Sequence, residues 1–185
     1  MIIRMGTEVY TAHTLAGNFT IFASVIGTGF QAATTTLVGK SIGAGEIEKA
    51  KKYTLSSIKL MSLSMTLMLF VTYLFSVQIS PIFTSNPVVI GLITAVLAIG
   101  VLTQPATATV ASLTASLHAG GDTKFPMHIT AIGIWAIRTV GVYLLGVYFG
   151  FGLIGVWIVI AIDNYFRAVL LLIRYHSFKW IKKLN

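Results

Sequence analysis

The sequence lacks cysteine and is poor in acidic residues. None of its 185 residues is a cysteine, which excludes disulfide bonds and cysteine-ligated metal sites. Only 5 residues are Asp or Glu, against 13 that are Lys or Arg. The 4 histidines do not have the spacing of a metal site, and no nucleophile stands beside a base in a catalytic motif. The sequence therefore predicts no catalytic residue, no metal site and no cofactor.

Charged residues of both signs are scarce. They make up 10% of the chain, whereas soluble domains are about 25% charged. Hydrophobic residues make up 56%, and the mean hydropathy is +0.87. The net charge of +8 lies in short segments between apolar runs and forms no basic face, which fits orientation in a bilayer better than nucleic-acid binding. The composition indicates a membrane protein, with the lipid bilayer as its partner and no nucleic acid.

Five apolar stretches are long enough to span the hydrocarbon core, which takes about 20 helical residues. Unpaired backbone groups are too costly in lipid for open strands or loops, so each stretch is predicted to be a helix. The sequence thus predicts one all-α domain over residues 1–185, a polytopic bundle of about five transmembrane helices. The predicted spans are residues 11–38, 53–79, 88–117, 127–149 and 152–173.

Lysine and arginine predict the orientation, because cytoplasmic loops carry their excess. The glycine-punctuated stretch 27–52 is interpreted as a membrane exit, in which a basic loop with four lysines follows the first span. The third loop and the carboxyl-terminal tail are also basic, whereas segments 80–87 and 150–151 carry no charge. The first span would then start outside, so we expect one or more helices to precede it. The basic residues of these segments are Lys40, Lys49, Lys51, Lys52, Lys124, Arg174, Lys179, Lys182 and Lys183.

Three ionisable residues, Arg138, Asp163 and Arg167, lie inside predicted spans. Arg138 is 11 residues past Met127 and Asp163 is 11 residues before Arg174, which places both about 16 Å from the cytoplasmic surface. Arg167 lies four residues after Asp163, on the same helical face, and competes for its carboxylate. Because intramembrane charges usually pair, we predict a structural ion pair. A direct role of Asp163 in binding substrate or protons is the alternative.

Uncharged polar side chains at membrane depth form a second set of candidates. Asn18, Gln31 and Gln104 are predicted to face the bundle interior, where they either bond neighbouring helices or line a substrate cavity. Pro105, beside Gln104, is predicted to kink the third span. Threonines near these residues are further candidates: Thr28, Thr34, Thr35, Thr36, Thr103, Thr107 and Thr109.

Several motifs, in their order and spacing, resemble the multidrug and toxic compound extrusion (MATE) family. The resemblance also includes Arg138, the opening of the fifth span at residues 152–157, and residues 167–180. The motifs are Gly29-Phe30-Gln31-Ala32-Ala33, Leu37-Val38-Gly39, Gly43-Ala44-Gly45 and His118-Ala119-Gly120-Gly121-Asp122-Thr123.

The resemblance implies a location and a mechanism. Family members have about twelve helices in two bundles, and this chain resembles helices eight to twelve, the C-terminal half. They sit in the cell membrane and export small cationic or amphipathic compounds in exchange for Na⁺ or H⁺ by alternating access. Span 88–117 has no Asp or Glu, so we expect the coupling-ion site outside this chain and the missing N-terminal bundle as its partner.

Two other functions stay open. A related flippase for lipid-linked or polysaccharide cargo would need cationic cavity residues, of which Arg138 and Arg167 are available. From a different class, the chain could be a non-transporting membrane subunit or a truncated remnant.

Overall fold

The computed structural model describes residues 6–177, which form α and π helices, a short 3-10 helix and the turns between them. Five stretches within this range are long and apolar enough to cross a membrane, so the predicted all-α membrane bundle is confirmed. The elements are α1 (Thr7–Gly43), α2 (Ile47–Leu74), α3 (Ser76–Ile79), η2 (Ser80–Ile82), α4 (Pro87–Ala119), α5 (Lys124–Ile132), η3 (Gly133–Thr139), η4 (Val142–Tyr148) and α6 (Gly152–His176).

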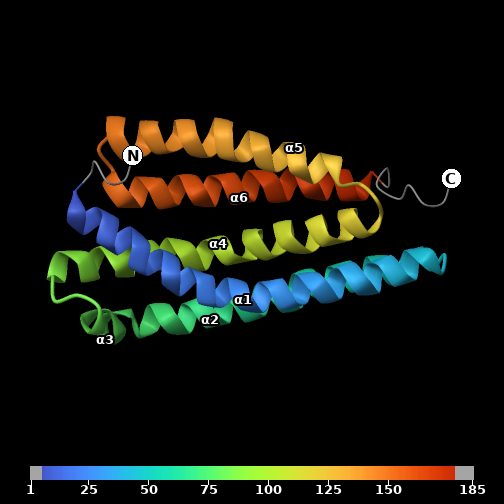
Figure 1. Ribbon diagram of the computed structural model, residues 1–185, viewed down its shortest axis with the longest axis horizontal. Helices are drawn as coiled ribbons and strands as arrows, with labels where there is room; N and C mark the ends of the chain where they lie inside the picture. Colours follow the sequence, from blue (N-terminus) through green and yellow to red (C-terminus); the bar gives the residue numbers. More distant parts are fainter. Residues whose placement is uncertain (1–5, 178–185) are drawn as a thin grey trace.

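The bundle is built around α4. Helices α1, α2 and α4 each pack against the other two, and α6 packs on α4. The helix formed by α5, η3 and η4 packs on α6, away from α1 and α2 (Figure 1). The 37 residues of α1 would be about 55 Å long, well beyond the hydrocarbon thickness, and α1 runs obliquely across α4 (Figure 1).

Buried hydroxyl groups connect the three packed helices α1, α2 and α4. The Ser57 hydroxyl of α2 is hydrogen-bonded to the Thr34 hydroxyl of α1, and its Oγ lies 3.1 Å from Ser112 Oγ of α4. One turn away, Thr54 Oγ1 of α2 lies 2.8 Å from Ser116 Oγ of α4. Small hydroxyl side chains let helix backbones approach closely and supply bonds that lipid cannot. Thr34, predicted as a possible cavity residue, therefore serves helix packing.

The first turn is much shorter than the predicted basic loop. Helix α1 continues to Gly43 and α2 begins at Ile47, so most of the expected loop at 39–52 is helical. Ion pairs between residues three apart, Lys49 with Glu46 at 3.0 Å and Lys51 with Glu48, support this polar helical turn. Gly45 makes the turn with a φ of 76°, a conformation that glycine adopts without steric cost. The charges thus extend the helix beyond the apolar stretch.

The segment that connects α2 to α4, at the opposite end of the bundle, contains two short helices that were not predicted. Helix α2 ends at Leu74, five residues before the predicted end at 79, and α3 and η2 follow. Asn86 caps α4 by accepting a 2.9 Å hydrogen bond from the Val88 N–H, and its amide donates to Glu8 at 2.7 Å. This bond connects the start of α1 to the start of α4.

The fourth span departs from an ordinary helix. After α5, its backbone is π-helical in η3 and η4; for example, Phe149 N–H donates to the Leu144 carbonyl, five residues back, at 2.9 Å. Wider helical turns of this kind are rare, but those that occur are often found at functional sites. The span pattern predicted a membrane helix here but not its winding.

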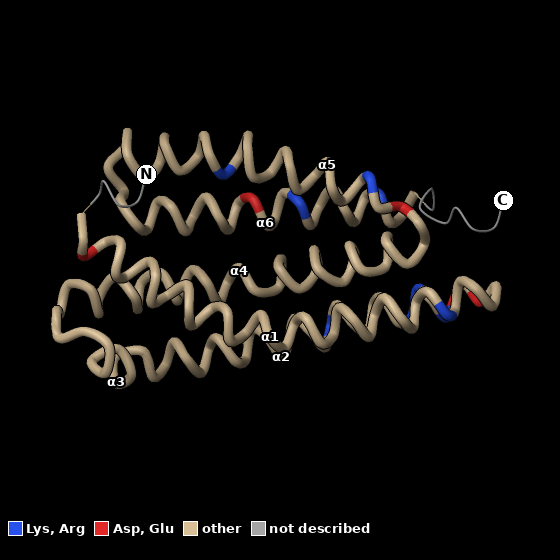
Figure 2. Tube along the Cα trace, in the orientation of Figure 1, with Lys and Arg blue, Asp and Glu red and all other residues tan. Residues whose placement is uncertain are grey.

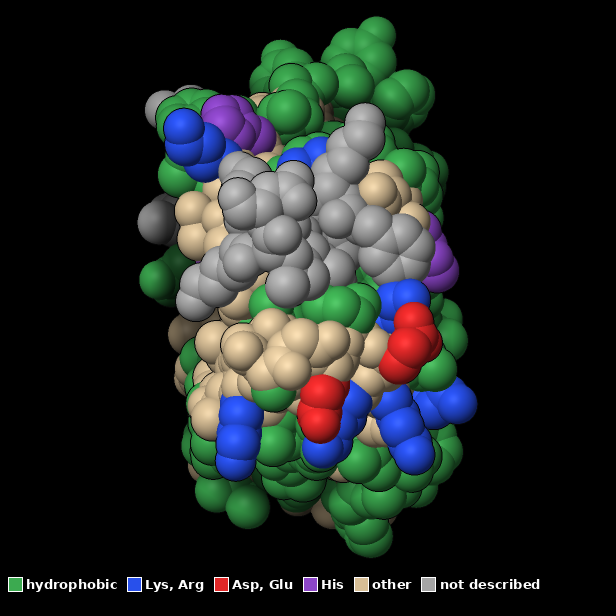
Figure 3. Space-filling view, turned by 90° about the vertical axis from the view of Figure 1, so that its right-hand side faces the viewer, with side chains coloured by type: hydrophobic (Ala, Val, Ile, Leu, Met, Phe, Trp, Pro, Cys, Tyr) green, Lys and Arg blue, Asp and Glu red, His purple; other side chains and the backbone are tan. Residues whose placement is uncertain are grey.

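Charges gather at one end of the bundle. Most of the described lysines and arginines lie at the right-hand end of Figure 2, and the few at mid-length lie on η3, α6 and α2. Figure 3 views that end and shows Lys and Arg side chains around it with two acidic ones. Lys179, Lys182 and Lys183 of the predicted basic tail lie outside the described residues. By the excess of basic residues, this end is predicted to face the cytoplasm.

Cysteine labelling tests that orientation. The sequence has no cysteine, so Lys49→Cys and Ser85→Cys each create the only thiol, and both positions are exposed at opposite ends. In intact cells an impermeant maleimide is expected to label Ser85→Cys but not Lys49→Cys. Permeabilised cells should label both equally, and the reverse pattern in intact cells would contradict the orientation.

Candidate functional site: a charged cavity at mid-bundle

Three charged side chains meet between α6 and η3. Asp163 of α6 has no exposed surface, and its Oδ2 accepts a 3.0 Å hydrogen bond from Nη2 of Arg138 on η3. Nη2 of Arg167 lies 3.0 Å from the same oxygen and donates to Asn164 Oδ1 at 3.1 Å. The structure thus brings together all three residues that helix depth and spacing selected. One carboxylate pairs with both arginines at once, whereas the sequence analysis expected the two arginines to compete for it.

A glycine makes room for the carboxylate. A Cβ atom at Gly133 would lie 2.3 Å from Asp163 Oδ1 and 3.0 Å from Arg167 Cδ. The absence of a side chain at the start of η3 therefore lets α6 approach with its charged residues facing η3. Because Arg138 lies further along the same π-helical segment, this close approach also sets its distance to Asp163.

A cavity of about 240 Å³ adjoins the charged cluster. Residues from α1, α4, η3 and α6 line it, and most of their side chains carry hydroxyl, amide, indole or guanidinium groups. They are Thr20, Ser24, Gly100, Thr103, Gln104, Thr107, Arg138, Trp157, Ile160 and Asn164.

Several polar atoms here have no hydrogen-bond partner among the described residues. They include Gln104 Oε1 and Trp157 Nε1 on the cavity wall, and Arg138 Nε. Gln104 is only 2% exposed. A buried polar group without a partner costs about 1–3 kcal/mol, and these atoms have almost no accessible surface, so they lie behind the cavity wall.

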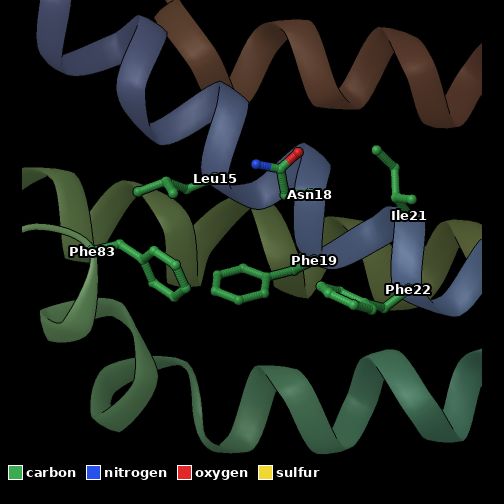
Figure 4. A pocket seen from close by; sticks show the side chains of 6 residues that line it. All are labelled: Leu15, Asn18, Phe19, Ile21, Phe22 and Phe83. Carbon is green, nitrogen blue, oxygen red and sulfur yellow. The ribbon is translucent and has the colours of Figure 1, made fainter.

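The predicted amides have different locations. Gln104 lines the cavity, whereas Gln31 lies on α1 two turns beyond Ser24 and is not among the lining residues. Asn18, predicted to face the bundle interior, is exposed. It lies in a separate groove of about 310 Å³ beside Phe19 and Phe83, with its amide pointing away from both rings (Figure 4). The buried stripe of α1 consists of apolar residues such as Ala16 and Phe19, which turns Asn18 outward.

The predicted threonines also separate into groups. Thr103 and Thr107 line the cavity. Thr28, Thr35 and Thr36 are exposed and donate to carbonyls of their own helix. Thr109 likewise bonds the Pro105 carbonyl at 2.8 Å.

Pro105 lies inside α4, one turn before Thr109. It has no N–H to donate to the preceding turn. The nearby Leu102 carbonyl accepts a 2.7 Å hydrogen bond from the Tyr165 hydroxyl of α6. This bond joins α4 to α6 on a face outside the cavity, where Leu102 and Tyr165 line a separate apolar groove.

A second ion pair lies at the basic end of the bundle and was not selected from the sequence. Asp122, in the turn after α4, is 2% exposed and accepts hydrogen bonds from Arg174 Nε at 2.8 Å and Nη2 at 2.6 Å. The Arg174 guanidinium lies 5.0 Å from the centre of the Phe125 ring. Both charges fall in segments that the sequence analysis interpreted from their basic residues and from the family resemblance, and neither interpretation indicates the pair.

Helices of membrane length around a charged polar cavity are the architecture of a membrane transport protein. A family model described as MatE matches residues 1–144. The chain belongs to this family of membrane transporters, and it is a multi-pass protein of the cell membrane.

Its relatives are longer proteins. The chain is 29% identical over 180 residues to the uncharacterized transporter YisQ of Bacillus subtilis, covering 97% of this chain and 39% of YisQ. It is 31% identical over 183 residues to a probable multidrug resistance protein NorM of Thermotoga maritima, covering 99% and 39%. For a probable NorM of Bacillus cereus the values are 29% over 174 residues, 94% and 38%. The chain therefore spans about two-fifths of these relatives.

A solved structure supports the fold. The MATE transporter ClbM, in a complex with Rb⁺, is 19% identical, and its structure matches with a TM-score of 0.88 over all of this chain and 44% of ClbM. At this identity the match establishes the arrangement of helices.

Proposed function

We propose that this chain forms most of the C-terminal bundle of a MATE-type multidrug exporter. In this proposal a preceding bundle supplies the other wall of the transport path, and compounds cross by alternating access in exchange for Na⁺ or H⁺. The observation that carries it is the cavity at mid-bundle, which hydroxyl, amide and guanidinium side chains such as Gln104 of α4 and Arg138 of η3 help to line. A polar and charged interior is costly in a membrane and marks a transport path. The family consists of transporters and not, in general, of enzymes.

The coupling ion is proposed to bind outside this chain. The described residues contain no cluster of three or more histidines and carboxylates that could hold a metal ion. Asp163 is already bonded to two arginines, which makes it a poor cation ligand.

An efflux assay with a chimera tests the proposal. This chain would replace the matching segment of the Bacillus cereus NorM relative in cells that lack their own drug pumps, with ethidium accumulation as the measurement. The chimera is expected to lower accumulation in an ion-gradient-dependent way, and this chain alone is expected to have no effect. Gradient-dependent efflux by the chain alone would contradict a role as one bundle of two.

A glutamine pair tests the cavity within the same chimera. Gln104→Leu is expected to reduce efflux about tenfold, because it removes the hydrogen bond, worth about 1.5 kcal/mol, that the amide would make to a bound substrate. Gln78→Leu is the matched control, since Gln78 is exposed on α3, which does not line the cavity. Equal losses in the two variants would show that the cavity does not bind the substrate.

A further inference from the structure

An apolar groove of about 750 Å³ lies between α4 and α6, on a face outside the mid-bundle cavity. Six residues of α6 between Ile158 and Val169 line it, together with Ile99 and Leu102 of α4. Its one polar side chain is Tyr165, whose hydroxyl donates to the Leu102 carbonyl at 2.7 Å. A ligand in this groove would therefore contact mainly hydrocarbon groups.

A second pocket, of about 200 Å³, continues the groove at the basic end of the bundle. Its lining residues Leu172 and His176 follow Val169 on α6 by three and seven positions, which places them on the same helical face. Leu113 of α4 lies 14 residues past Ile99, close to four full turns. Since α4 and α6 lie side by side as far as this end (Figure 1), the two pockets follow one line along both helices.

The apolar part of the groove has the length of one membrane leaflet. Val169 is 11 residues after Ile158, so this part is about 16 Å long. Half of the hydrocarbon core is about 15 Å thick. His176 lies at the end of α6, where the lipid headgroups begin. The groove therefore extends from mid-membrane to the headgroups of the leaflet at the basic end.

The pocket at the basic end combines apolar side chains with N–H donors. Lys51 of α2 and His176 of α6 line it. Lys51 pairs with Glu48, whose side chain is 87% exposed, and a phosphate would share the ammonium, which has three donors. Lys52 and Lys59 flank this face of α2, so positive charge exceeds negative charge here. Basic pockets between transmembrane helices on the cytoplasmic side bind anionic lipid headgroups.

From this arrangement we propose that the groove binds an anionic phospholipid of the cytoplasmic leaflet. One acyl chain would lie between α4 and α6, and the phosphate would accept hydrogen bonds from Lys51 and His176. A soluble anion would leave the apolar part of the groove unused, and an apolar helix would supply no charge for the basic pocket. The inference goes beyond the proposed function, because it does not depend on which compounds are exported.

Native mass spectrometry of the delipidated chain in neutral detergent tests the site, because it resolves bound lipid and oligomeric state together. The probes are dioleoyl phosphatidylglycerol, dioleoyl phosphatidylcholine and glycerol 3-phosphate, which separate the headgroup charge, the acyl chains and the soluble phosphate. Phosphatidylglycerol is expected to bind one saturable site, with phosphatidylcholine at least about fivefold weaker, the effect of about one basic residue on an anionic lipid. Glycerol 3-phosphate is expected not to displace it.

Charge variants identify the headgroup contact. Lys51→Gln with His176→Gln is expected to raise the dissociation constant for phosphatidylglycerol about tenfold or more. Lys49→Gln with His128→Gln is the matched control. It also removes a lysine that pairs with a glutamate three residues away and an exposed histidine, and neither residue lines the groove. The control should bind phosphatidylglycerol as the unchanged chain does.

A second pair of variants tests the acyl-chain contact. Ala161→Phe fills the groove between α4 and α6 and is expected to weaken binding of both phospholipids about tenfold, the loss when about two methylene groups are no longer buried. Ala131→Phe, on an exposed face of α5, is the control. Ala161→Leu carries this test if Ala161→Phe does not fold.

Equal affinity for the two phospholipids would overturn the proposal, as would equal effects of the two double charge variants or of the two phenylalanine variants. Displacement of the lipid by glycerol 3-phosphate would overturn it in favour of a soluble anion. A dimer that binds no lipid and that Ala161→Phe abolishes would assign the groove to a second copy of the chain. A chimera without efflux would refute the exporter proposal and leave each of these measurements unaffected.

Discussion

Asp163→Asn is expected to lower the melting temperature in detergent more than any other single change in the charged cluster. The fully buried carboxylate of Asp163 lies 3.0 Å from the nearest nitrogens of both Arg138 and Arg167. Its neutral replacement leaves two arginines without a counter-charge, and breaking a buried pair costs roughly 3–5 kcal/mol. Arg138→Gln should cost less, because Asp163 keeps Arg167 and Arg138 is itself partly exposed.

Combined variants separate a pair from a cluster of three. If only Arg138 and Asp163 were paired, replacing both would restore most of the stability. Because Arg167 shares the carboxylate, Asp163→Asn with Arg138→Gln should remain destabilised, and adding Arg167→Gln should recover much of the loss, as neutral replacement of whole buried ion clusters often does. Unchanged melting of Asp163→Asn, with loss of efflux in the chimera, would instead assign Asp163 to substrate or proton binding.

Gly155→Ala is expected to have the second large effect. A Cβ atom at this position of α6 would lie 2.7 Å from the Leu145 carbonyl oxygen and 2.9 Å from Phe151 Cβ. The Leu145 oxygen belongs to the backbone of η4, so the helices themselves must move apart. Overpacking of this kind typically costs about 1–3 kcal/mol, and we expect the upper end, measured as a lower melting temperature.

Gly91→Ala is the matched control for this prediction. Gly91 lies on an exposed face of α4, and a Cβ there would meet no atom within 4 Å. Since alanine favours helix over glycine by up to about 1 kcal/mol, this variant should melt at the same temperature or higher. Equal melting of the two variants would contradict the close contact between η4 and α6.

The helices could be predicted from sequence because span length and hydropathy are strong constraints in a bilayer. Their ends could not, since charge marks where a chain leaves the hydrocarbon and not where a helix stops. Segment 47–52 is an example, because ion pairs along it continue α2 into the aqueous region. The π-helical winding of η3 was also missed, because it leaves no periodic pattern in the sequence.

The candidate site was predictable in its charged part. Arg138 and Asp163 could be matched by depth because charges in a membrane seek partners. Trp157 was missed because an apolar-looking ring gives no sign that its N–H is unpaired. Asn18 was placed inside by a rule about polar groups, whereas the packing stripe of α1 turns it outward.

The Asp122–Arg174 pair has a mechanical consequence. Arg174 belongs to the last turn of α6, and Asp122 lies in the turn between α4 and α5. The pair therefore holds the end of α6 against the turn between α4 and α5. A displacement of α6 at mid-bundle would be passed to that turn, because the three helices are joined at the basic end. If a ligand in the cavity displaces α6, we expect the larger movement at the opposite end of the bundle, where Phe151 joins η4 to α6.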